Sequence, residues 1–305
     1  MYTHKLTPRA TSGEPMQFHN IAIIGQPQKI TGHNDTIQRL YDYLKSLGLN
    51  AYVESYTAAA IEFQGDGSMT MEQLAEICDL AVVVGGDGSV IGAARLLAFA
   101  NIPIIGINRG HLGFLSDLSK NSFEEPLLEI LNGKYHAEHR SCLRTEKIHK
   151  GKVIERSIAL NEVVLSSTIT AHMINFTVLF DGHFVYSLNA DGLIISTPTG
   201  STAYNLSAGG PIIAPELEAM CLTPMFPHSL TCRPIVVDGD HVITITLNRS
   251  DHCQISCDGQ IKTDVSQGDE LQVHMDRSII TILHPYTYDY FRVLREKLGW
   301  GGQLI

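Results

Sequence analysis

The chain has 305 residues, of which 44% are hydrophobic and 18% are charged, and its formal net charge is −10. This length allows two domains and this apolar fraction allows sizeable cores, which argues against global disorder. Only 22 residues are Lys or Arg, which argues against binding to a nucleic-acid backbone. A small anion can still be held by local backbone N–H groups.

Targeting signals and metal motifs are not evident. No apolar run is long enough to span a bilayer, so we expect no membrane association. Residues 1–20 are polar and lack the apolar core of a signal peptide, and we expect them to form a flexible tail. The 6 Cys contain no Cys-x-x-Cys pair, which predicts reduced thiols in a cytoplasmic protein. The 14 His show no ligand spacing, so we expect no structural metal.

Strand and helix patterns alternate through residues 21–125. Short apolar runs alternate with segments of helical spacing, and the run Leu80–Val84 is purely apolar, as in a parallel strand buried on both faces. The expected elements are strand 21–24, helix 37–47, strand 51–55, helix 71–77, strand 80–84, helix 89–100 and strand 102–107. This order predicts a doubly wound, Rossmann-like α/β domain whose ligands bind at the carboxyl ends of the strands.

The pattern changes after residues 126–133. Short strands rich in β-branched residues follow, and two of the expected hairpins turn at Asp181-Gly182 and Asp258-Gly259. Residues 126–284 therefore predict a β-rich, sandwich-like domain. Residues 285–305 form a C-terminal segment, whose helix at 286–298 is expected to pack back on the first domain.

The first glycine-rich loop is Gly85-Gly86-Asp87-Gly88-Ser89, between a strand and a helix. As a plain turn, it would use its glycines for the bend and Asp87 or Ser89 as the helix N-cap. That interpretation leaves three glycines around one acid unexplained. The pattern therefore favours a loop that lets phosphate approach the backbone at a helix N-terminus, with Asp87 facing the ligand.

The second glycine-rich loop is the run Thr197–Tyr204, which also follows an apolar strand. It could be a Ser/Thr-rich turn that caps a helix. Its hydroxyl groups around Gly200 also offer donors to phosphate oxygens. We therefore expect phosphate contacts from Thr199, Gly200 and Ser201, in addition to those from Gly85, Gly86, Gly88 and Ser89. Two such loops indicate phosphoryl transfer between a nucleotide and a second ligand.

Other motifs leave two interpretations open. The segment Asn108–Leu115 is either a plain loop or a ligand loop at a strand end. Asn161-Glu162 interrupts an apolar run, either as a satisfied buried pair or as a contact to ribose hydroxyls. Asp191-Gly192 and Asp258-Gly259-Gln260 could be no more than turns.

These motifs together resemble the bacterial NAD kinase family. The match includes Gly85–Ser89, Asn108–Leu115, Asn161–Val164, the long run Asp191–Pro211, and Asp258–Gln260. The segments Pro227–Leu230 and Arg233-Pro234 also belong to it. Phosphofructokinases and diacylglycerol kinases share the first loop, so the run Thr197–Tyr204 carries most of the resemblance.

The resemblance implies ATP-dependent phosphorylation of the adenosine-ribose 2′-hydroxyl of NAD, with a divalent metal, Mg²⁺, in a homo-oligomer. By matching position, Asp87 is implied to be the general base. Asn189 stands where many relatives carry a basic residue. The implied NAD contacts are Asp87, Gly88, Asn161, Glu162, His172, Asn189, Asp191, Thr202, Ala203, Tyr204, Asn205, Leu206, Ser207 and Gln260.

Two other functions fit the same fold. One is a kinase that acts on a lipid or a sugar phosphate, although the acidic charge balance disfavours docking on an anionic membrane. The other is a dinucleotide sensor without activity, which the presence of Asp87 disfavours.

Overall fold

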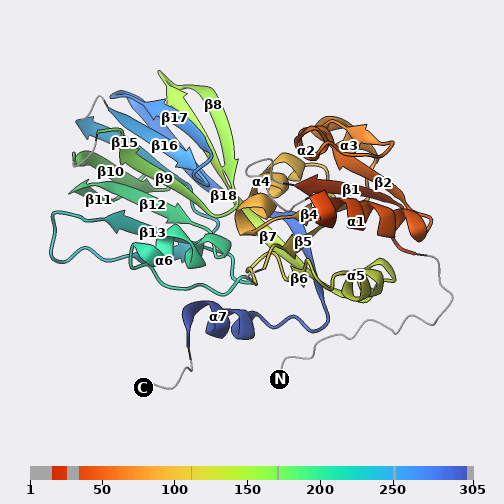
Figure 1. Ribbon diagram of the computed structural model, residues 1–305. Helices are drawn as coiled ribbons and strands as arrows, with labels where there is room; N and C mark the ends of the chain where they lie inside the picture. The colour runs from red at the N-terminus through yellow and green to blue at the C-terminus, as the bar shows by residue number, and fades with distance from the viewer. Residues whose placement is uncertain (1–15, 26–33, 111, 170–171, 250–251, 301–305) are drawn as a thin grey trace. The chain divides into compact units, whose positions relative to one another are not determined.

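The computed structural model describes residues 16–25, 34–110, 112–169, 172–249 and 252–300, so all of the expected tail except residues 16–20 lies outside the described part. The chain divides into two compact units (Figure 1). Unit 1 comprises the residues up to Glu138 and those from Thr281 onward, and unit 2 comprises His139–Ile280.

Unit 1 is built on a parallel sheet with the hydrogen-bonded order β18-β5-β4-β1-β2-β3. Every residue of β4 and β5 is buried, as the apolar run at residues 80–84 predicts. The strands are β1 (Asn20–Gly25), β2 (Asn50–Glu54), β3 (Ser68–Met69), β4 (Leu80–Val84), β5 (Ile104–Asn108), β6 (Leu118–Ser119), which pairs with β5, and the last residues of β18 (Asp269–Pro285).

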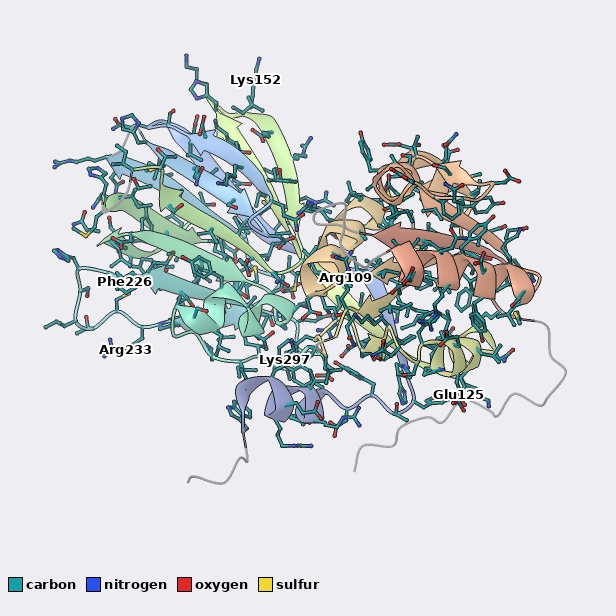
Figure 2. All side chains as sticks on the ribbon, in the orientation of Figure 1. Arg109, Glu125, Lys152, Phe226, Arg233 and Lys297 are labelled. Atoms are coloured by element: carbon teal, nitrogen blue, oxygen red, sulfur yellow. The ribbon has the colours of Figure 1, made fainter. Side chains whose placement is uncertain are left out.

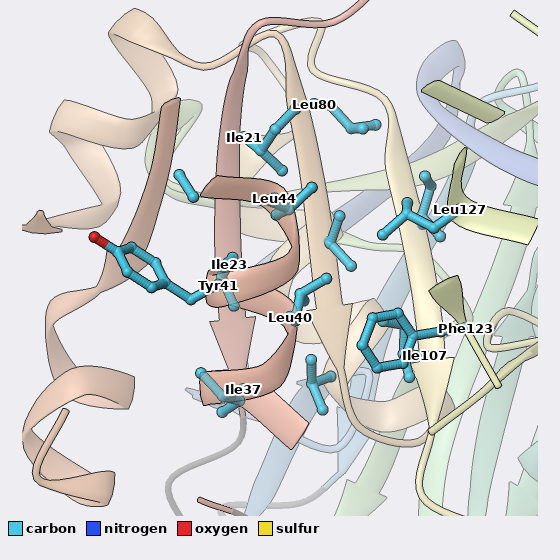
Figure 3. Close-up of a cluster of buried hydrophobic side chains, with 14 of the residues drawn as sticks. Ile21, Ile23, Ile37, Leu40, Tyr41, Leu44, Leu80, Ile107, Phe123 and Leu127 are labelled. Carbon is cyan, nitrogen blue, oxygen red and sulfur yellow. The ribbon is translucent and has the colours of Figure 1, made fainter. Parts of the chain in front are cut away.

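Helices α1, α2 and α5 of unit 1 bury apolar residues in one core with the sheet. In Figure 3, Ile37, Leu40 and Leu44 of α1 pack with Ile21 of β1 and Leu127 of α5. This helical spacing of apolar residues removes one face of α1 from water. The helices are α1 (Asn34–Ser46), α2 (Ser55–Ile61), α3 (Met71–Ile77), α4 (Asp87–Leu97), α5 (Glu124–Leu131) and α7 (Tyr290–Leu298).

Helix α5 occupies the place where the sequence pattern indicates a domain junction. Pro126 lies in its first turn, where a missing N–H costs no intrahelical hydrogen bond. Leu127, Ile130 and Leu131 join the core of unit 1. The first unit therefore extends to Glu138 rather than ending at residue 125.

Two other helices differ from expectation at their start. Helix α2 replaces the end of the expected strand 51–55, because Glu54 caps it by accepting the N–H groups of Tyr56 and Thr57. Helix α7 begins at Tyr290 rather than at residue 286, because Asp289 accepts the N–H groups of Phe291 and Arg292. In both cases a side-chain cap fixes the first helical residue.

A buried histidine fixes the return of the chain to unit 1. His284 lies between Asp117 (Nδ1 to Oδ2, 3.1 Å) and Glu138 (Nε2 to Oε2, 2.9 Å) and stacks on Tyr288. Burial alone would lower the pKa of His284, but the hydrogen bonds and charges of the two carboxylates raise it above its ordinary value. These two hydrogen bonds tie β18 to the segments of Asp117 and Glu138 and favour the protonated form of the ring.

Unit 2 is a sandwich of antiparallel sheets, as expected for the β-rich half. One sheet has the order β14-β13-β12-β9-β16-β17, and β11, β10, β15 and β18 pair in a second. Their facing apolar residues form one core that includes Phe176, Leu193 and Ile245.

The elements of unit 2 are β7 (Tyr135–His149, from His139), β8 (Lys152–Ala159), β9 (Glu162–Ser167), β10 (Ile174–Phe180), β11 (His183–Ala190), β12 (Gly192–Ser196), η1 (Thr199–Thr202), α6 (Tyr204–Ser207), β13 (Ala219–Met225), β14 (Ile235–Asp238), β15 (Ile243–Arg249), β16 (Cys253–Cys257), β17 (Ile261–Val265) and the first part of β18. In the described ranges, no helix is both long enough and apolar enough to span a membrane.

Candidate functional site

The carboxylate of Asp87 is held at the carboxyl end of the sheet in unit 1. It lies in the first turn of α4 and accepts hydrogen bonds from the N–H of Phe114 (2.9 Å), the N–H of Leu115 (3.0 Å) and the hydroxyl of Ser116 (3.1 Å). These donors come from the loop after β5, the strand beside β4. A carboxylate offers about four acceptor positions, so three bonds orient Asp87 and leave capacity for a ligand. Its side chain is only half-buried.

The glycines around Asp87 have different functions. A Cβ on Gly86 or Gly88 would have no heavy atom within 4 Å, and both residues are exposed. A Cβ on Gly85 would lie 2.2 Å from Ser89 Oγ, and one on Gly113 would lie 2.1 Å from Asp87 Oδ1. Gly85 and Gly113 therefore permit tight packing, whereas Gly86 and Gly88 leave the start of α4 accessible.

Helix α4 begins with Gly86 as its N-cap, and no side chain caps it. The alternative interpretation, in which Asp87 or Ser89 caps the helix, is therefore not supported. The N–H groups of Ser89 (2.9 Å) and Val90 (3.2 Å) donate to Gly86 O, and phosphate binding at the start of α4 stays a prediction.

The segment Asn108–Leu115 forms a structured loop beside this site. Asn108 is buried, and its Oδ1 accepts the N–H of Gly110 (3.0 Å). Arg109, labelled in Figure 2, donates from Nη2 to the carbonyl of Val84 (3.4 Å). Burial lowers the pKa of Arg109 from its ordinary value. His111 of this segment lies outside the described residues.

Three segments predicted to bind NAD or phosphate meet at one end of the six-stranded sheet in unit 2. Glu162 at the start of β9 pairs with Ser196 at the end of β12, and Val163 pairs with Cys257 at the end of β16. This register brings Asn161-Glu162, the loop after Ser196 and the turn at Asp258 together. The turn also carries Gln260, which is exposed.

The hydroxyl groups of the second glycine-rich loop bind mainly to the loop itself. Thr197 Oγ1 donates to Leu160 O (2.6 Å), and the fully buried Ser201 donates from Oγ to Pro198 O (2.6 Å). A Cβ on Gly200 would lie 2.1 Å from Asn161 O. These contacts hold the loop against Asn161, and they add no support for phosphate binding by Gly200 or Ser201, which stays a prediction.

Thr199 also forms hydrogen bonds within the protein. Its Oγ1 accepts a hydrogen bond from Nη1 of the buried Arg140 (3.2 Å), and its carbonyl accepts the hydroxyl of Thr202 (3.2 Å). Thr202 and Ala203 are half-buried. The motif therefore encodes a rigid loop, whose remaining accessible groups lie at its end.

Glu162 is buried, with 8% of its surface exposed. Burial, reinforced by the charge of Asp258, raises the pKa of Glu162 to about 7, although the N–H of Tyr204 opposes the shift. Its Oε2 has no hydrogen-bond partner within the described part of the chain. A carboxyl group that exchanges its proton near neutral pH can donate or accept a hydrogen bond.

Helix α6 links this end of the sheet to a pocket. Asn205 is fully buried, and its amide bonds to Ser201 O (3.3 Å), Pro211 O (3.0 Å) and Thr223 Oγ1 (2.6 Å). Asn205 therefore anchors α6 on β13, and its expected NAD contact stays a prediction. Leu206 beside it is half-buried.

The pocket in unit 2 has a volume of about 380 Å³. Most of its lining is apolar, and Arg233 supplies the cation. The lining residues include Tyr204, Ser207, Met225, Phe226, Cys232 and Arg233. Phe226 and Arg233, both labelled in Figure 2, belong to the segment between β13 and β14. Tyr204 is 43% exposed and Phe226 is 79% exposed. Such a pocket suits a flat aromatic ring with a polar substituent.

His172, Asn189 and Asp191 lie at the opposite end of the sandwich from Glu162. Asp191 precedes β12 and donates its N–H to Met225 O (2.9 Å), next to the pocket. Asn189 on β11 accepts from the amide of Asn175 (2.7 Å), and His172 is exposed before β10. Four residue steps along β12 separate the two ends by about 14 Å. An extended dinucleotide is long enough to reach both.

Two of the residues that shape these sites, Ser116 and Arg140, lie outside the sequence motifs, whereas Gly113 belongs to the segment Asn108–Leu115. Ser116 and Gly113 shape the surroundings of Asp87, and Arg140 holds Thr199. The paired glycines of Asn108–Leu115 were a usable signal for the first two. Nothing in the sequence near Arg140 points to Thr199, because the contact joins residues 59 positions apart.

Within the described residues, no group of three or more His, Cys, Asp or Glu side chains is arranged to hold a metal ion. The expectation of no structural metal stays a prediction. Mg²⁺ commonly uses one or two carboxylates together with substrate phosphates and water. Asp87 at the accessible start of α4 fits an ion that arrives with a nucleotide.

Both halves of the chain match family models. Residues 21–135 match the ATP-NAD kinase N-terminal domain, and residues 160–283 match the ATP-NAD kinase C-terminal domain. The chain belongs to the NAD kinase family. An NAD kinase of Shewanella loihica is 48% identical over 290 residues, covering 94% of this chain and 99% of the relative. One of Aeromonas salmonicida is 46% identical, with the same coverage.

Solved structures of NAD and NADH kinases also match this chain. The structure of yeast NADH kinase complexed with NADH has a TM-score of 0.84 and 25% identity, covering 96% of this chain and 90% of that one. An NAD kinase from Archaeoglobus fulgidus in complex with ATP has a TM-score of 0.72 and 27% identity, covering 92% and 98%. The family resemblance, the fold class and the assignment as an ATP-dependent NAD kinase are therefore confirmed.

Proposed function

We propose that this member of the NAD kinase family transfers the γ-phosphate of ATP to the 2′-hydroxyl of the adenosine ribose of NAD, giving NADP and ADP. The observation that supports the assignment of residues to this reaction is the environment of the Asp87 carboxylate. This carboxylate is fixed by three donors, remains partly accessible and lies at an uncapped helix N-terminus flanked by open glycines.

Asp87 acts as the general base. The bond between ribose O2′ and the γ-phosphorus forms, the bond from that phosphorus to the bridging oxygen breaks, and its electron pair leaves with ADP. The hydroxyl proton passes to Asp87. The reference pKa of Asp is near ~3.9, so its carboxylate is a weak base. Because the transition state is loose, Asp87 orients the hydroxyl and takes the proton late.

The start of α4 binds phosphate through its N–H groups, with Gly86 and Gly88 allowing close approach. In unit 2, Asn161 and Glu162 bind ribose hydroxyls, and the pocket beside Tyr204 takes a ring of the dinucleotide. Asp191 lies at the same end of β12 as the pocket. A divalent ion that arrives with ATP neutralises phosphate charge when it is bound.

We also propose that the protein works in the cytoplasm as a homo-oligomer. All six cysteines are free thiols, and five of them are buried, which suits a reducing compartment. The proposal of a homo-oligomer is based on the family resemblance. Light scattering on the purified protein measures its mass directly, and a monomer would contradict this part of the proposal.

The reaction is tested with purified protein, ATP, Mg²⁺ and either NAD or NADH. We expect NADP or NADPH to form, measured with a dehydrogenase that accepts only the phosphorylated coenzyme. Parallel reactions offer a diacylglycerol or a sugar phosphate as acceptor. Phosphorylation of those acceptors alone, or NAD binding without turnover, would contradict the proposed function.

A further inference from the structure

Two Asp-Gly turns in unit 2 share positive φ values and have different surroundings. Asp258 and Gly259 join β16 to β17 with φ values of 51° and 67°. Asp181 and Gly182 join β10 to β11 with φ values of 46° and 80°. Both pairs have positive φ values, in a three-residue loop (258–260) between β16 and β17 and in a two-residue loop between β10 and β11. Turn formation therefore explains both Asp-Gly sequences, but it does not explain what each aspartate side chain binds.

The carboxylate of Asp258 binds the backbone of the segment that precedes β9. It accepts the N–H of Leu160 (2.9 Å), of Asn161 (2.8 Å) and of Glu162 (3.2 Å). In return, the N–H of Asp258 donates to Glu162 O (3.0 Å). Hydrogen bonds from N–H groups to an ionised carboxylate are about twice as strong as neutral ones. Four bonds therefore fix this segment to the turn.

The other side of the same segment is held by the second glycine-rich loop. Asn161 O accepts the N–H of Thr197 (2.9 Å), and Thr197 Oγ1 donates to Leu160 O (2.6 Å). Residues 160–162 therefore lie between two rigid supports. Their side chains at positions 161 and 162 are the two proposed to bind ribose, so the supports determine where those side chains stand.

Asp258 also acts on Glu162 through its charge. Burial and the charge of Asp258 together raise the pKa of Glu162 to about 7, and the N–H of Tyr204 on α6 opposes them. On β7, burial raises the pKa of the Cys142 thiol to about 12, with contributions from the charges of Asp258 and Asp276. Cys142 is therefore neutral at physiological pH, and the charge that acts on Glu162 is that of Asp258.

Asp181 provides the contrast. Its exposed carboxylate binds the N–H of Val242 (2.9 Å) and the ring of His241 (2.7 Å). The hydrogen bond to His241 holds the pKa of Asp181 below its ordinary value. None of these partners belongs to the proposed NAD site, and Asp181 holds the segment before β15 instead.

We propose that Asp258 is a positioning residue of the NAD kinase reaction, which sets the backbone of residues 160–162 and thereby the ribose contacts of Asn161 and Glu162. This inference rests on the proposed placement of NAD at those two residues. It assigns Asp258 no contact with the reacting atoms.

Asp258→Asn tests the inference, with Asp181→Asn as the matched control. The amide removes the negative charge and turns an NH₂ group toward backbone N–H groups, while side-chain size is kept. We expect the KM for NAD to rise about tenfold with kcat changed less than threefold, because a ground-state contact is displaced. The control variant should leave both constants unchanged.

A pH profile separates positioning from simple loss of stability. In the wild type, the KM for NAD should change near pH 7, where Glu162 gains or loses its proton. In Asp258→Asn this inflection should move to lower pH, because a charge that favours protonation is gone. Asp258→Glu retains the charge but displaces the oxygens, so it should raise KM and keep the inflection near pH 7; it also serves if Asp258→Asn does not fold.

Asn161→Ala distinguishes this inference from the proposed function. If Asn161→Ala leaves the KM for NAD unchanged, the proposed NAD placement fails. If Asn161→Ala raises KM while a folded Asp258→Asn, or in its absence Asp258→Glu, has the KM of the wild type, the positioning role of Asp258 is overturned.

Discussion

Gly86 and Gly88 in the first glycine-rich loop face open space, whereas Gly200 in the second lies against the carbonyl of Asn161. In the first loop, the acid Asp87 is half-buried and accessible; beside the second, the acid Glu162 is almost fully buried. Glycine next to polar residues therefore has two physical meanings in this chain. One loop leaves room for a ligand, and the other allows two protein segments to pack closely.

The largest expected effect breaks the chemistry at the first loop. Asp87→Asn keeps an oxygen that can accept from the loop after β5 but removes the base. We expect kcat to fall roughly 10²–10⁴-fold while NAD binding stays close to wild type. Steady-state kinetics and calorimetric titration with NAD measure the two effects. A kcat within threefold of wild type would remove Asp87 from its proposed role.

The acid beside the second loop should show itself in stability rather than in turnover. The pKa of Glu162 is raised from 4.5 to about 7 on folding, so the folded state keeps its proton over that range. Its stabilising contribution is complete below pH 4.5 and is lost as pH rises to about 7. The corresponding change in unfolding free energy is about 3 kcal/mol.

Glu162→Gln cannot titrate, so it should lack this loss. Urea denaturation at pH 5 and pH 8 gives the unfolding free energy of each protein. We expect wild type to lose about 2–3 kcal/mol more than the variant between these conditions, because pH 5 already lies above 4.5. Equal pH dependence in the two proteins would show that Glu162 is ionised throughout.

A smaller effect compares the glycines directly. Gly200→Ala puts a methyl group 2.1 Å from Asn161 O, a backbone atom that cannot move by itself. We expect a loss of about 1–3 kcal/mol in unfolding free energy, measured by urea denaturation. Gly88→Ala is the matched control, since its methyl group meets no atom within 4 Å in the first turn of α4.

Gly88→Ala should change stability by at most about 1 kcal/mol, in the stabilising direction, because alanine loses less chain entropy in a helix. Its kcat/KM should nevertheless fall, because the methyl group enters the space left for the ligand. If Gly88→Ala destabilises the protein as much as Gly200→Ala does, the contrast between the two loops is wrong.

Local pattern was sufficient for much of the fold. The apolar run Leu80–Val84 gave a strand buried on both faces, and the stripe through Ile37, Leu40 and Leu44 gave α1. The sequence pattern was a poor guide where the structural effect of a residue depends on its position within a helix. The change of pattern after residues 126–133 predicted a domain boundary at residue 125, yet Pro126 lies in the first turn of α5, where its missing N–H is harmless.

The motifs by themselves determined the family and the identity of the acid and the loops, because those depend on which residue types follow one another. Tertiary structure decided which polar groups of a loop are still available to a ligand. The polar side-chain atoms of Ser201 and Asn205 form hydrogen bonds with Ile213, Pro211 and Thr223. Asp258 binds residues 160–162, which lie 96–98 positions before it in the chain. A polar side chain satisfied by a distant partner cannot be distinguished, in sequence, from one that waits for a substrate.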